Sequence, residues 1–508
     1  MDGATGQDSL GFKWIFSWGR WRVRLHDGSR VLNISPRDLG DPSFRVDLGL
    51  EYNYLAGAMA NGIASEALVI SMAKSGMLGF FGAAGLSLER VSAAIQSIKS
   101  ALGSLPFGFN LIHSPNEPLH EEAIANLYIR EEIRLVEASA FLDLTIPLIA
   151  YRLHGIHQDA MGNIVTPNRV VAKVSRIEVA TRFFSPPPER FIKELVATGK
   201  LTHAQAALAA KVPVAQDITA EADSGGHTDN RPAITLLPTI MALRDRLQEQ
   251  FQYPVKLRVG AAGGIATPAS VVAAFMMGAA YVVTGSVNQA CRESGSCDLV
   301  RKMLAEAGQA DVAMAPAADM FEMGVKVQVL KRGTMFAMRA QKLYDTYKEN
   351  ESLESIHGPE REQLEKQIFK APFQEIWRQT REFFLKRDPS QVGRAEADPK
   401  HKMALVFRWY LGQSSRWANA GEPTRAVDYQ VWCGPAMGAF NEWTRGTWLE
   451  KPENRSAPEV AMNLMLGACE LFRFRISTFL GSEIVGNHSP KPLSRQELAG
   501  YLQAGVLA

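Results

Sequence analysis

One polar stretch, residues 217–232, carries residue types suited to acid–base chemistry. It reads Asp-Ile-Thr-Ala-Glu-Ala-Asp-Ser-Gly-Gly-His-Thr-Asp-Asn-Arg-Pro, and the apolar run before it predicts a short buried strand. Gly225 and Gly226 let the backbone approach a flat ligand and adopt positive φ. His227 follows them, and a histidine that titrates near neutrality can act as an acid or a base. The alternative is an ordinary polar turn with an incidental histidine.

Two glycine-containing segments further along the chain have the composition of phosphate-binding loops. Residues 260–265 read Gly-Ala-Ala-Gly-Gly-Ile, and residues 284–286 read Thr-Gly-Ser before an expected helix. In (β/α)8 barrels a phosphate often sits between the loops after strands seven and eight, on backbone N–H groups. Each segment alone could be a tight turn. Their position after two consecutive predicted strands favours a phosphate site.

The elements that must position these residues alternate between short apolar strands and helices from about residue 50. Helices are expected at 86–102, 188–210 and 268–277, with Ser87 as an N-cap. Eight strands, most followed by a helix, predict an α/β fold, a (β/α)8 TIM barrel. A doubly wound sheet is the alternative, but residues 57–62 lack the Gly-x-Gly-x-x-Gly pattern that its first turn needs. The expected strands are 54–58, 78–81, 107–111, 136–140, 170–174, 212–217, 257–261 and 281–284.

Size and composition are those of a water-soluble globular protein. The chain has 508 residues, 46% hydrophobic and 21% charged, which is ordinary for this class and too long for one simple core. A net charge of +2 gives no global basic field for nucleic acid or a membrane surface. No signal peptide and no membrane-spanning run is recognised, so a cytoplasmic location is expected. The four cysteines are spaced for neither a metal site nor a disulfide framework.

Both ends of the chain depart from the strand–helix rhythm. Residues 11–48 alternate aromatic and basic side chains, which predicts strands; a small β appendage is favoured over a nucleic-acid surface because the total charge is near neutral. Beyond residue 287 the strand pattern is lost, and mainly helices are expected. A long apolar-faced helix is predicted at 458–480.

With these motifs in view, the chain resembles the PfaD-type flavin-dependent enoyl reductases of polyunsaturated fatty acid synthases and the related trans-acting reductases of polyketide synthases. The resemblance covers about residues 50–485, and residues 217–232 and 432–440 are its most specific parts. Nitronate monooxygenases belong to the same wider superfamily. The other segments that carry the resemblance are residues 57–60, 109–111, 173–176, 260–265, 283–286 and 321–339.

The resemblance implies a domain order that explains why the strands stop. A β-rich appendage at 1–50 precedes the barrel at 51–290. A helical substrate or carrier-protein domain is inserted at 291–430. The chain then returns at 431–485 to complete the barrel, and 486–508 forms a tail.

The resemblance also implies FMN as the cofactor and assigns residues to it. Lys173 is expected to put positive charge near the flavin ring, although pairing with Asp217 or Glu221 is an equal alternative. His227 is expected to protonate the substrate or to hold its carbonyl, oriented by Asp223 or Asp229. Asn110 offers a donor and an acceptor. The expected catalytic residues are His227 and Lys173, and the expected FMN contacts are Ala58, Met59, Ala60, Asn110, Lys173, Asp217, Gly226, His227, Gly263, Gly264, Gly285 and Ser286.

The implied reaction has two halves. NADPH or NADH reduces FMN, and hydride then passes to the β-carbon of an enoyl thioester carried by an acyl carrier protein. Carrier proteins are acidic, so Lys326, Lys331 and Arg332 are candidate docking residues, and a homodimer is a candidate assembly. The alternatives are a nitronate monooxygenase on the same fold and a non-catalytic flavoprotein scaffold within a synthase.

Overall fold

A closed barrel of eight parallel strands forms the centre of the protein, which confirms the predicted (β/α)8 fold. The structure is a computed structural model that describes residues 5–7, 13–17, 20–24, 34–479 and 489–505. Around the barrel the order is β10, β11, β13, β14, β4, β5, β6, β7, with β7 closing on β10. The barrel strands are β4 (Tyr54–Ala56), β5 (Leu78–Phe81), β6 (Gly108–Ile112), β7 (Leu135–Ser139), β10 (Arg169–Val174), β11 (Asp217–Glu221), β13 (Arg258–Ala262) and β14 (Val282–Thr284).

Helices cover the outside of the barrel, and polar caps set where several of them begin. The side chain of Ser65 accepts the Leu68 N–H at the start of α2, and that of Ser87 accepts the Arg90 N–H at the start of α3, as predicted. The covering helices are α1 (Pro42–Leu48), α2 (Glu66–Lys74), α3 (Leu88–Leu102), α4 (Pro118–Arg130), α5 (Ile146–Leu153), α6 (Ile177–Phe184), α7 (Glu189–Ala197), α8 (His203–Ala209), α9 (Ala233–Phe251) and α10 (Pro268–Met276).

The stretch predicted as helical at 188–210 is helical, but the chain divides it into two helices, α7 and α8. Gly199 takes a φ of +71° just after α7 ends. Thr202 then starts α8 with a capping box, in which its side chain and that of Gln205 satisfy each other's backbone N–H groups. Two local signals therefore override the continuous apolar pattern.

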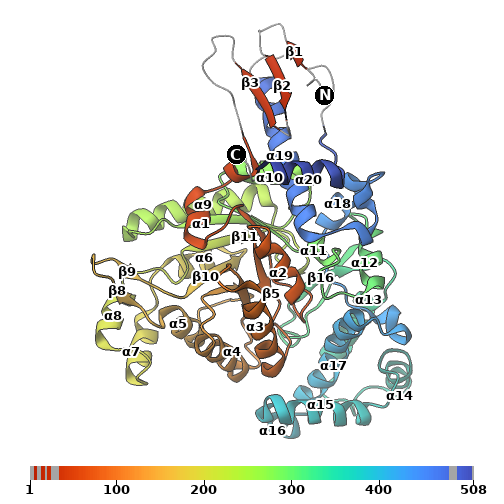
Figure 1. Ribbon diagram of the computed structural model, residues 1–508. Helices are drawn as coiled ribbons and strands as arrows, with labels where there is room; N and C mark the ends of the chain where they lie inside the picture. Colours follow the sequence, from red (N-terminus) through yellow and green to blue (C-terminus); the bar gives the residue numbers. More distant parts are fainter. Residues whose placement is uncertain (1–4, 8–12, 18–19, 25–33, 480–488, 506–508) are drawn as a thin grey trace.

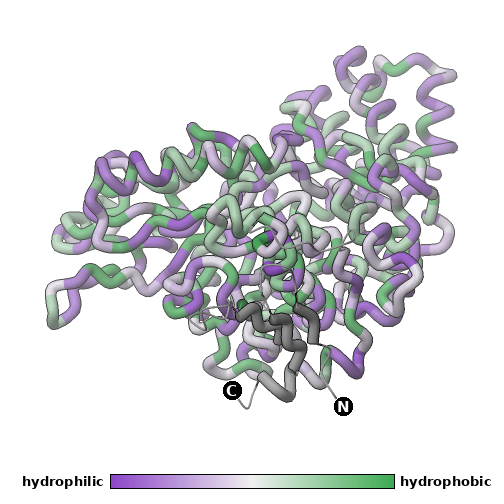
Figure 2. The backbone as a smooth tube through the Cα atoms, turned by 90° about the horizontal axis from the view of Figure 1, so that it is seen from above, coloured by the Kyte–Doolittle hydropathy of each residue, from purple (hydrophilic) through white to green (hydrophobic). Residues whose placement is uncertain are grey.

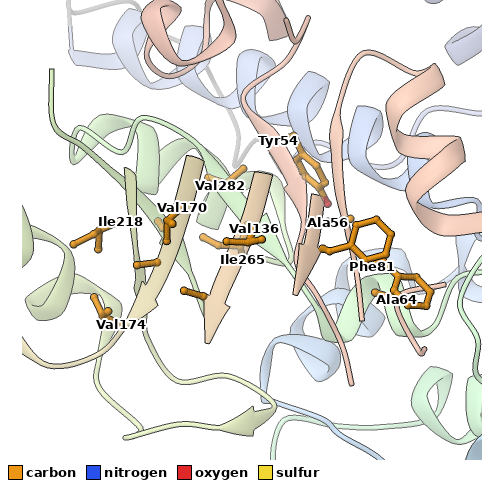
Figure 3. Packing of buried hydrophobic residues seen from close by; sticks show 14 of the residues in the cluster. Tyr54, Ala56, Ala64, Phe81, Val136, Val170, Val174, Ile218, Ile265 and Val282 are labelled. Atoms are coloured by element: carbon orange, nitrogen blue, oxygen red, sulfur yellow. The ribbon is translucent and has the colours of Figure 1, made fainter. Parts of the chain in front are cut away.

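Successive residues of each barrel strand face opposite sides, and this alternation separates the core from the site. Val136 and Val170 point outward into the layer between strands and helices, together with Tyr54 and Phe81 (Figure 3). Leu135 and Val171 belong instead to the cluster that fills the barrel interior. Continuing along those strands, Glu137 and Lys173 fall on the interior side, near the carboxyl ends.

Strand six lies later than predicted. The prediction was 212–217, whereas β11 runs from Asp217 to Glu221. The backbone N–H groups of Val214 and Ala215 donate to carbonyls of Ser185 and Phe183, so the apolar run packs beside α6 rather than joining the barrel ladder. As a result Asp217 begins the strand instead of ending it.

The expected loss of strands after residue 287 is also wrong. β15 (Val312–Pro316) and β16 (Lys326–Leu330) pair antiparallel, and β16 pairs with the two-residue β12 (Gly226–His227). This small sheet and most of the helices after it share a second hydrophobic core. The helices are α13 (Phe336–Glu349), α14 (Gly358–Gln363), the π-helix η2 (Leu364–Phe369), α15 (Phe373–Arg387), α16 (Pro389–Ala397) and α17 (Pro399–Ala420), which extend to the lower right in Figure 1.

The chain then returns to the barrel. The predicted long helix is present as α19 (Ala457–Phe479), which packs against α10 and α2. In a (β/α)8 barrel the last strand is followed by a full helix. Here α11 (Ser286–Gln289), which follows β14, has only four residues. α19 takes the place of that helix on the outside of the barrel. The other elements of this part are α12 (Asp298–Ala305), η3 (Pro423–Asp428), α18 (Ala436–Thr444), η4 (Trp448–Glu450), η5 (Pro452–Asn454) and α20 (Arg495–Gly505).

Smaller elements complete the fold. Within the predicted appendage, β1 (Thr5–Gln7), β2 (Lys13–Ser17) and β3 (Arg20–Arg24) form an antiparallel sheet, η1 (Pro36–Asp38) follows, and residues 1–4, 8–12, 18–19 and 25–33 lie outside the described residues, as do 480–488 and 506–508. A hairpin of β8 (His157–Gln158) and β9 (Ile164–Val165) projects beside α8. Figure 2 shows hydrophilic residues recurring along the outer helices. No helix within the described ranges is long and apolar enough to cross a membrane.

Candidate active site

A crevice opens at the carboxyl ends of the barrel strands, where enzymes of this fold carry their active sites. It consists of a hollow of about 410 Å³ and a smaller one of about 80 Å³. The larger hollow is walled on one side by barrel loops and on the other by α15 and α17. Both are lined by Ala58, Met59, Lys173, Glu221, Gly225 and Trp432, so they adjoin and form one site.

The small hollow brings together the four residues predicted to hold a phosphate. Gly263 and Gly264 have φ of +81° and +75°, values that favour glycine. A Cβ built on Gly285 would meet no atom within 4 Å, so the space beside this residue is open. The hydroxyl of Ser286 accepts the Gly434 N–H at 3.1 Å. α11 is too short for a large helix dipole, so a phosphate in this hollow would be bound by individual backbone N–H groups of the loops.

Inside the barrel mouth, Lys173 lies between two carboxylates. Its Nζ is 3.2 Å from Glu221 and 3.8 Å from Glu137, which is fully buried. Burial alone would lower the pKa of Lys173, but the two carboxylates outweigh burial and raise it. Burial raises the pKa of Glu137, against the effect of Lys173. The lysine is therefore a fixed cation. Of the two partners considered from the sequence, Glu221 is confirmed and Asp217 is not, and Glu137 is the second carboxylate.

The loop after β4 presents only part of the backbone that was predicted to face a ligand. The Ala58 N–H donates to Glu137 Oε2 at 2.9 Å and is therefore occupied. The N–H groups of Met59 and Ala60 bind no acceptor among the described residues. Asn110 donates from Nδ2 to the Glu137 carbonyl at 3.0 Å and to Ser139 Oγ at 2.7 Å. Only its amide oxygen is left for a ligand, so Asn110 can offer an acceptor but not the predicted donor.

His227 reaches the large hollow from β12, and its partner is Asp319. The His227 Nε2 and Asp319 Oδ1 atoms are 3.1 Å apart. Burial would lower the pKa of His227, but the Asp319 carboxylate outweighs it, so the pKa is raised above the usual 6.5. The histidine side chain is still 26% exposed. This pair favours the protonated imidazole beside an open cavity.

Neither aspartate predicted to orient His227 contacts it. Asp229 accepts from Arg176 Nε and Nη2 and from Ser175, and this pairing lowers its pKa to about 2. Asp223 accepts from Asn230 and Gln328. Both carboxylates therefore stabilise the loop that carries His227 and do not orient its side chain.

Two glycine segments cross behind the histidine. A Cβ on Gly225 would lie 2.9 Å from the Cys433 backbone, and a Cβ on Gly434 would lie 2.7 Å from the Gly225 nitrogen. Gly226, at a φ of +83°, packs against the ring of Trp432. The segments at 225–226 and 432–434 are therefore glycine-rich because two backbones touch there.

Asp217 is not brought to this site. It begins β11 at the amino end of the barrel, where Arg258 contacts both its oxygens at 2.6 and 3.2 Å. Both residues are almost fully buried. Asp217 lines neither hollow, so its assignment to the cofactor is corrected: it belongs to the amino-end core.

Two residues of the site, Glu137 and Asp319, were not predicted from the sequence. Glu137 could have been found, because it alternates with outward-facing Val136 and Ala138 on a predicted strand. Asp319 had no such signal, since it follows β15, a strand that was not predicted. No group of three or more potential metal ligands occurs among the described residues.

Comparison with protein families matches this architecture. The nitronate monooxygenase model matches residues 45–357. The model of the inserted helical domain of [acyl-carrier-protein] S-malonyltransferase matches residues 350–429. Fold, site and match together define the class, an oxidoreductase barrel of the nitronate monooxygenase type.

Relatives narrow this class. One of the polyunsaturated fatty acid synthase subunits of Thraustochytrium sp. is 49% identical over 86% of this chain and 30% of its own length. Polyketide biosynthesis protein PksE of Bacillus subtilis is 43% identical over 88% of this chain and 58% of its own length. The chain thus spans less than two thirds of the length of these relatives.

Two solved structures have the same fold as this chain. The crystal structure of the enoyl reductase domain of MlnA from the macrolactin biosynthesis cluster of Bacillus amyloliquefaciens has a TM-score of 0.83 at 42% identity, covering 87% of this chain and 100% of that domain. FabK from Thermotoga maritima, at 17% identity and a TM-score of 0.52, shares the fold. The chain belongs to the nitronate monooxygenase family, and within it the chain is similar to the PfaD-type enoyl reductases.

Proposed function

We propose that the protein is an FMN-dependent enoyl reductase that acts on enoyl thioesters carried by an acyl carrier protein in polyunsaturated fatty acid or polyketide synthesis. The observation that carries the proposal is the His227–Asp319 pair, which opens into the same crevice as the glycine loops. The printed names of the relatives, which are synthase components, support the substrate class. The match to a helical domain of a carrier-protein enzyme supports the partner.

The residues of the small hollow fit the phosphate of FMN. The open space beside Gly285 and the positive φ angles of Gly263 and Gly264 leave room for a phosphate against the backbone. Lys173 supplies positive charge and the Asn110 oxygen supplies an acceptor in the adjoining hollow. When bound, FMN would take hydride from NADPH or NADH and give it to the β-carbon.

A residue of the chain supplies the proton that the substrate needs after hydride transfer. His227, whose protonated form is favoured by Asp319, donates to the α-carbon of the substrate. Its partial exposure lets solvent restore the proton afterwards. Lys326, Lys331 and Arg332 remain proposed carrier contacts; Lys326 is exposed, and Arg332 also pairs with Asp311 at 3.7 Å.

The proposal is tested by separating the two half-reactions in stopped-flow spectroscopy. The protein is first reduced anaerobically with NADPH and then mixed with an enoyl thioester. Reoxidation by the thioester supports the reductase, whereas reoxidation only by a nitronate with oxygen supports a nitronate monooxygenase. Retention of flavin without either reaction supports a scaffold.

His227→Ala sharpens this experiment. We expect it to retain flavin and to slow the thioester half-reaction by roughly 10²–10⁴, the range of a general acid. Reduction by NADPH should change much less. His203→Ala, at an exposed position on α8, is the control. Equal slowing of both half-reactions would make His227 a positioning residue instead.

A further inference from the structure

The mouth of the large hollow carries three arginines that the proposed reaction does not use. Arg387 ends α15, and Arg408 and Arg416 lie on α17, and all three line the hollow. Phe383, on α15, lies among them and is 37% exposed although it is a large aromatic side chain. Arg416 and the Phe383 ring are exposed to solvent, so this arginine cluster, here called the rim, can be reached from outside.

Only part of this charge is neutralised. Arg387 forms a close ion pair with Glu117, which also lies 4.0 Å from Arg408. Arg408 is a further 3.5 Å from Glu322. No carboxylate among the described residues forms an ion pair with Arg416, and burial followed by repulsion from Arg387 lowers its pKa. The fold therefore keeps one arginine without a counter-charge beside another cation.

The ring of Phe383 holds two of these cations in place. The guanidinium carbons of Arg387 and Arg416 lie 5.6 and 5.5 Å from its centroid, a cation–π geometry on both counts. Phe383 is itself fixed by an edge contact with Phe384, which is buried. Two guanidinium groups from different helices are thereby gathered around one ring before any ligand arrives.

His120, which lies close enough to Arg387 to feel its charge, adds no positive charge to the rim. Burial and then Arg387 lower the pKa of His120 to about 4, so it is neutral at neutral pH. The rim thus carries its excess positive charge through arginine alone. Guanidinium groups bind phosphate oxygens with two parallel hydrogen bonds, and they do so better than any other side chain.

We propose that Arg416 and Arg387, around Phe383, form a subsite for the phosphate ester of an incoming ligand. The inference rests on the proposed function and deepens it. The arm of an acyl carrier protein bears such a phosphate, and so does a nicotinamide nucleotide. Arg408 donates to the Ala318 carbonyl at 2.8 Å, next to Asp319, so the rim and His227 share one wall. A ligand held at the rim is thereby guided toward the acid.

Steady-state kinetics with paired thioesters test the subsite. One substrate is an enoyl thioester of phosphopantetheine and the other is the same acyl group on N-acetylcysteamine, which lacks the phosphate. For Arg416→Ala we expect KM for the phosphate-bearing thioester to rise roughly 10-fold, the loss of about one charge-assisted hydrogen bond. Its kcat and the KM for the N-acetylcysteamine thioester should stay within twofold. Arg416→Lys should restore part of the loss.

Matched measurements identify the source of the phosphate. Arg381→Ala, on α15 but paired with Glu396 and outside the hollow, is the control and should change nothing. If KM rises for NADPH instead of the thioester, the nucleotide supplies the phosphate and the subsite stands. Equal shifts for both thioesters, or no shift with any ligand, would overturn it.

Direct binding separates this proposal from the reductase proposal. Calorimetry compares phosphopantetheine with pantetheine on the wild-type protein and on Arg416→Ala. We expect the phosphate to strengthen binding only when Arg416 is present. If the protein reduces no thioester but shows this difference, the enoyl reductase assignment fails and the subsite remains. If it reduces thioesters without this difference, the subsite fails alone.

Discussion

The two ends of the barrel interior each hold a buried ion pair, and they differ in how completely it is satisfied. At the amino end, Arg258 binds both oxygens of Asp217 and also reaches Asp47 at 2.9 Å, beneath the stacked rings of Phe44 and Tyr281. At the carboxyl end, Lys173 is shared between two glutamates, and Glu137 Oε1 has no partner among the described residues.

The difference separates a structural ion pair from a functional one. A buried pair whose hydrogen bonds are complete holds elements together and has nothing left to offer a ligand. A buried carboxylate with one free oxygen, next to an open hollow, retains bonding capacity at a cost in stability. The extent to which the charged groups are buried does not distinguish the two ends of the barrel.

The largest effect is expected from Gly285→Asp at the carboxyl end, which should abolish flavin retention. The new side chain would enter open space in the small hollow, so the barrel should still fold. Its carboxylate would repel a phosphate there. Flavin absorbance beside circular dichroism measures both. Gly285→Asn is the uncharged control; a folded, fully yellow aspartate variant would put the phosphate elsewhere.

Asp217→Ala at the amino end should produce the opposite pattern. Removing one partner of a buried ion pair costs about 3–5 kcal/mol, because Arg258 loses its buried carboxylate and keeps only the partly exposed Asp47. We expect the urea midpoint to fall strongly while flavin content per folded molecule is unchanged. Glu375→Gln, which breaks an exposed pair with Arg378, should move the midpoint little. Flavin loss without loss of stability would return Asp217 to the cofactor site.

The smallest effect is a shift in pH dependence from Asp319→Asn. The Asp319 carboxylate raises the pKa of His227 against burial, so its removal lowers that pKa. The thioester half-reaction needs protonated His227 and therefore declines as pH rises through this pKa. In the variant the decline should begin at lower pH, while flavin content stays constant. An unmoved profile would mean that another group supplies the proton.

The sequence predicted what depends on local pattern. The barrel strands, the glycine loops and His227 follow from apolar runs and from residues a few positions apart. Strand six was misplaced because the buried run before Asp217 packs on α6, which looks the same in sequence as pairing in a sheet. β16, with alternating Val327 and Val329 inside, carried a signal that could have been used.

What could not be predicted depends on contacts between distant residues. Asp319 meets His227 only because β16 pairs with β12. Glu137 accepts the Ala58 N–H although β7 and β4 are not neighbours in the barrel. No spacing rule in the sequence describes such meetings. The arginine rim could not be predicted either, because it forms only where α15 and α17 bring Arg387 and Arg416 to the ring of Phe383.

The crossing of Gly225 and Gly434 also has a consequence for synthesis on the ribosome. The two residues are 209 positions apart (434 − 225), so the loop carrying His227 gains its backing only after that much more chain has been made. At roughly 5–20 residues per second this takes about 10–40 s. Once β14 has been made, all eight barrel strands exist while one wall of the crevice is still missing. Cofactor capture is thus expected late in synthesis, after the chain has returned from the helical region.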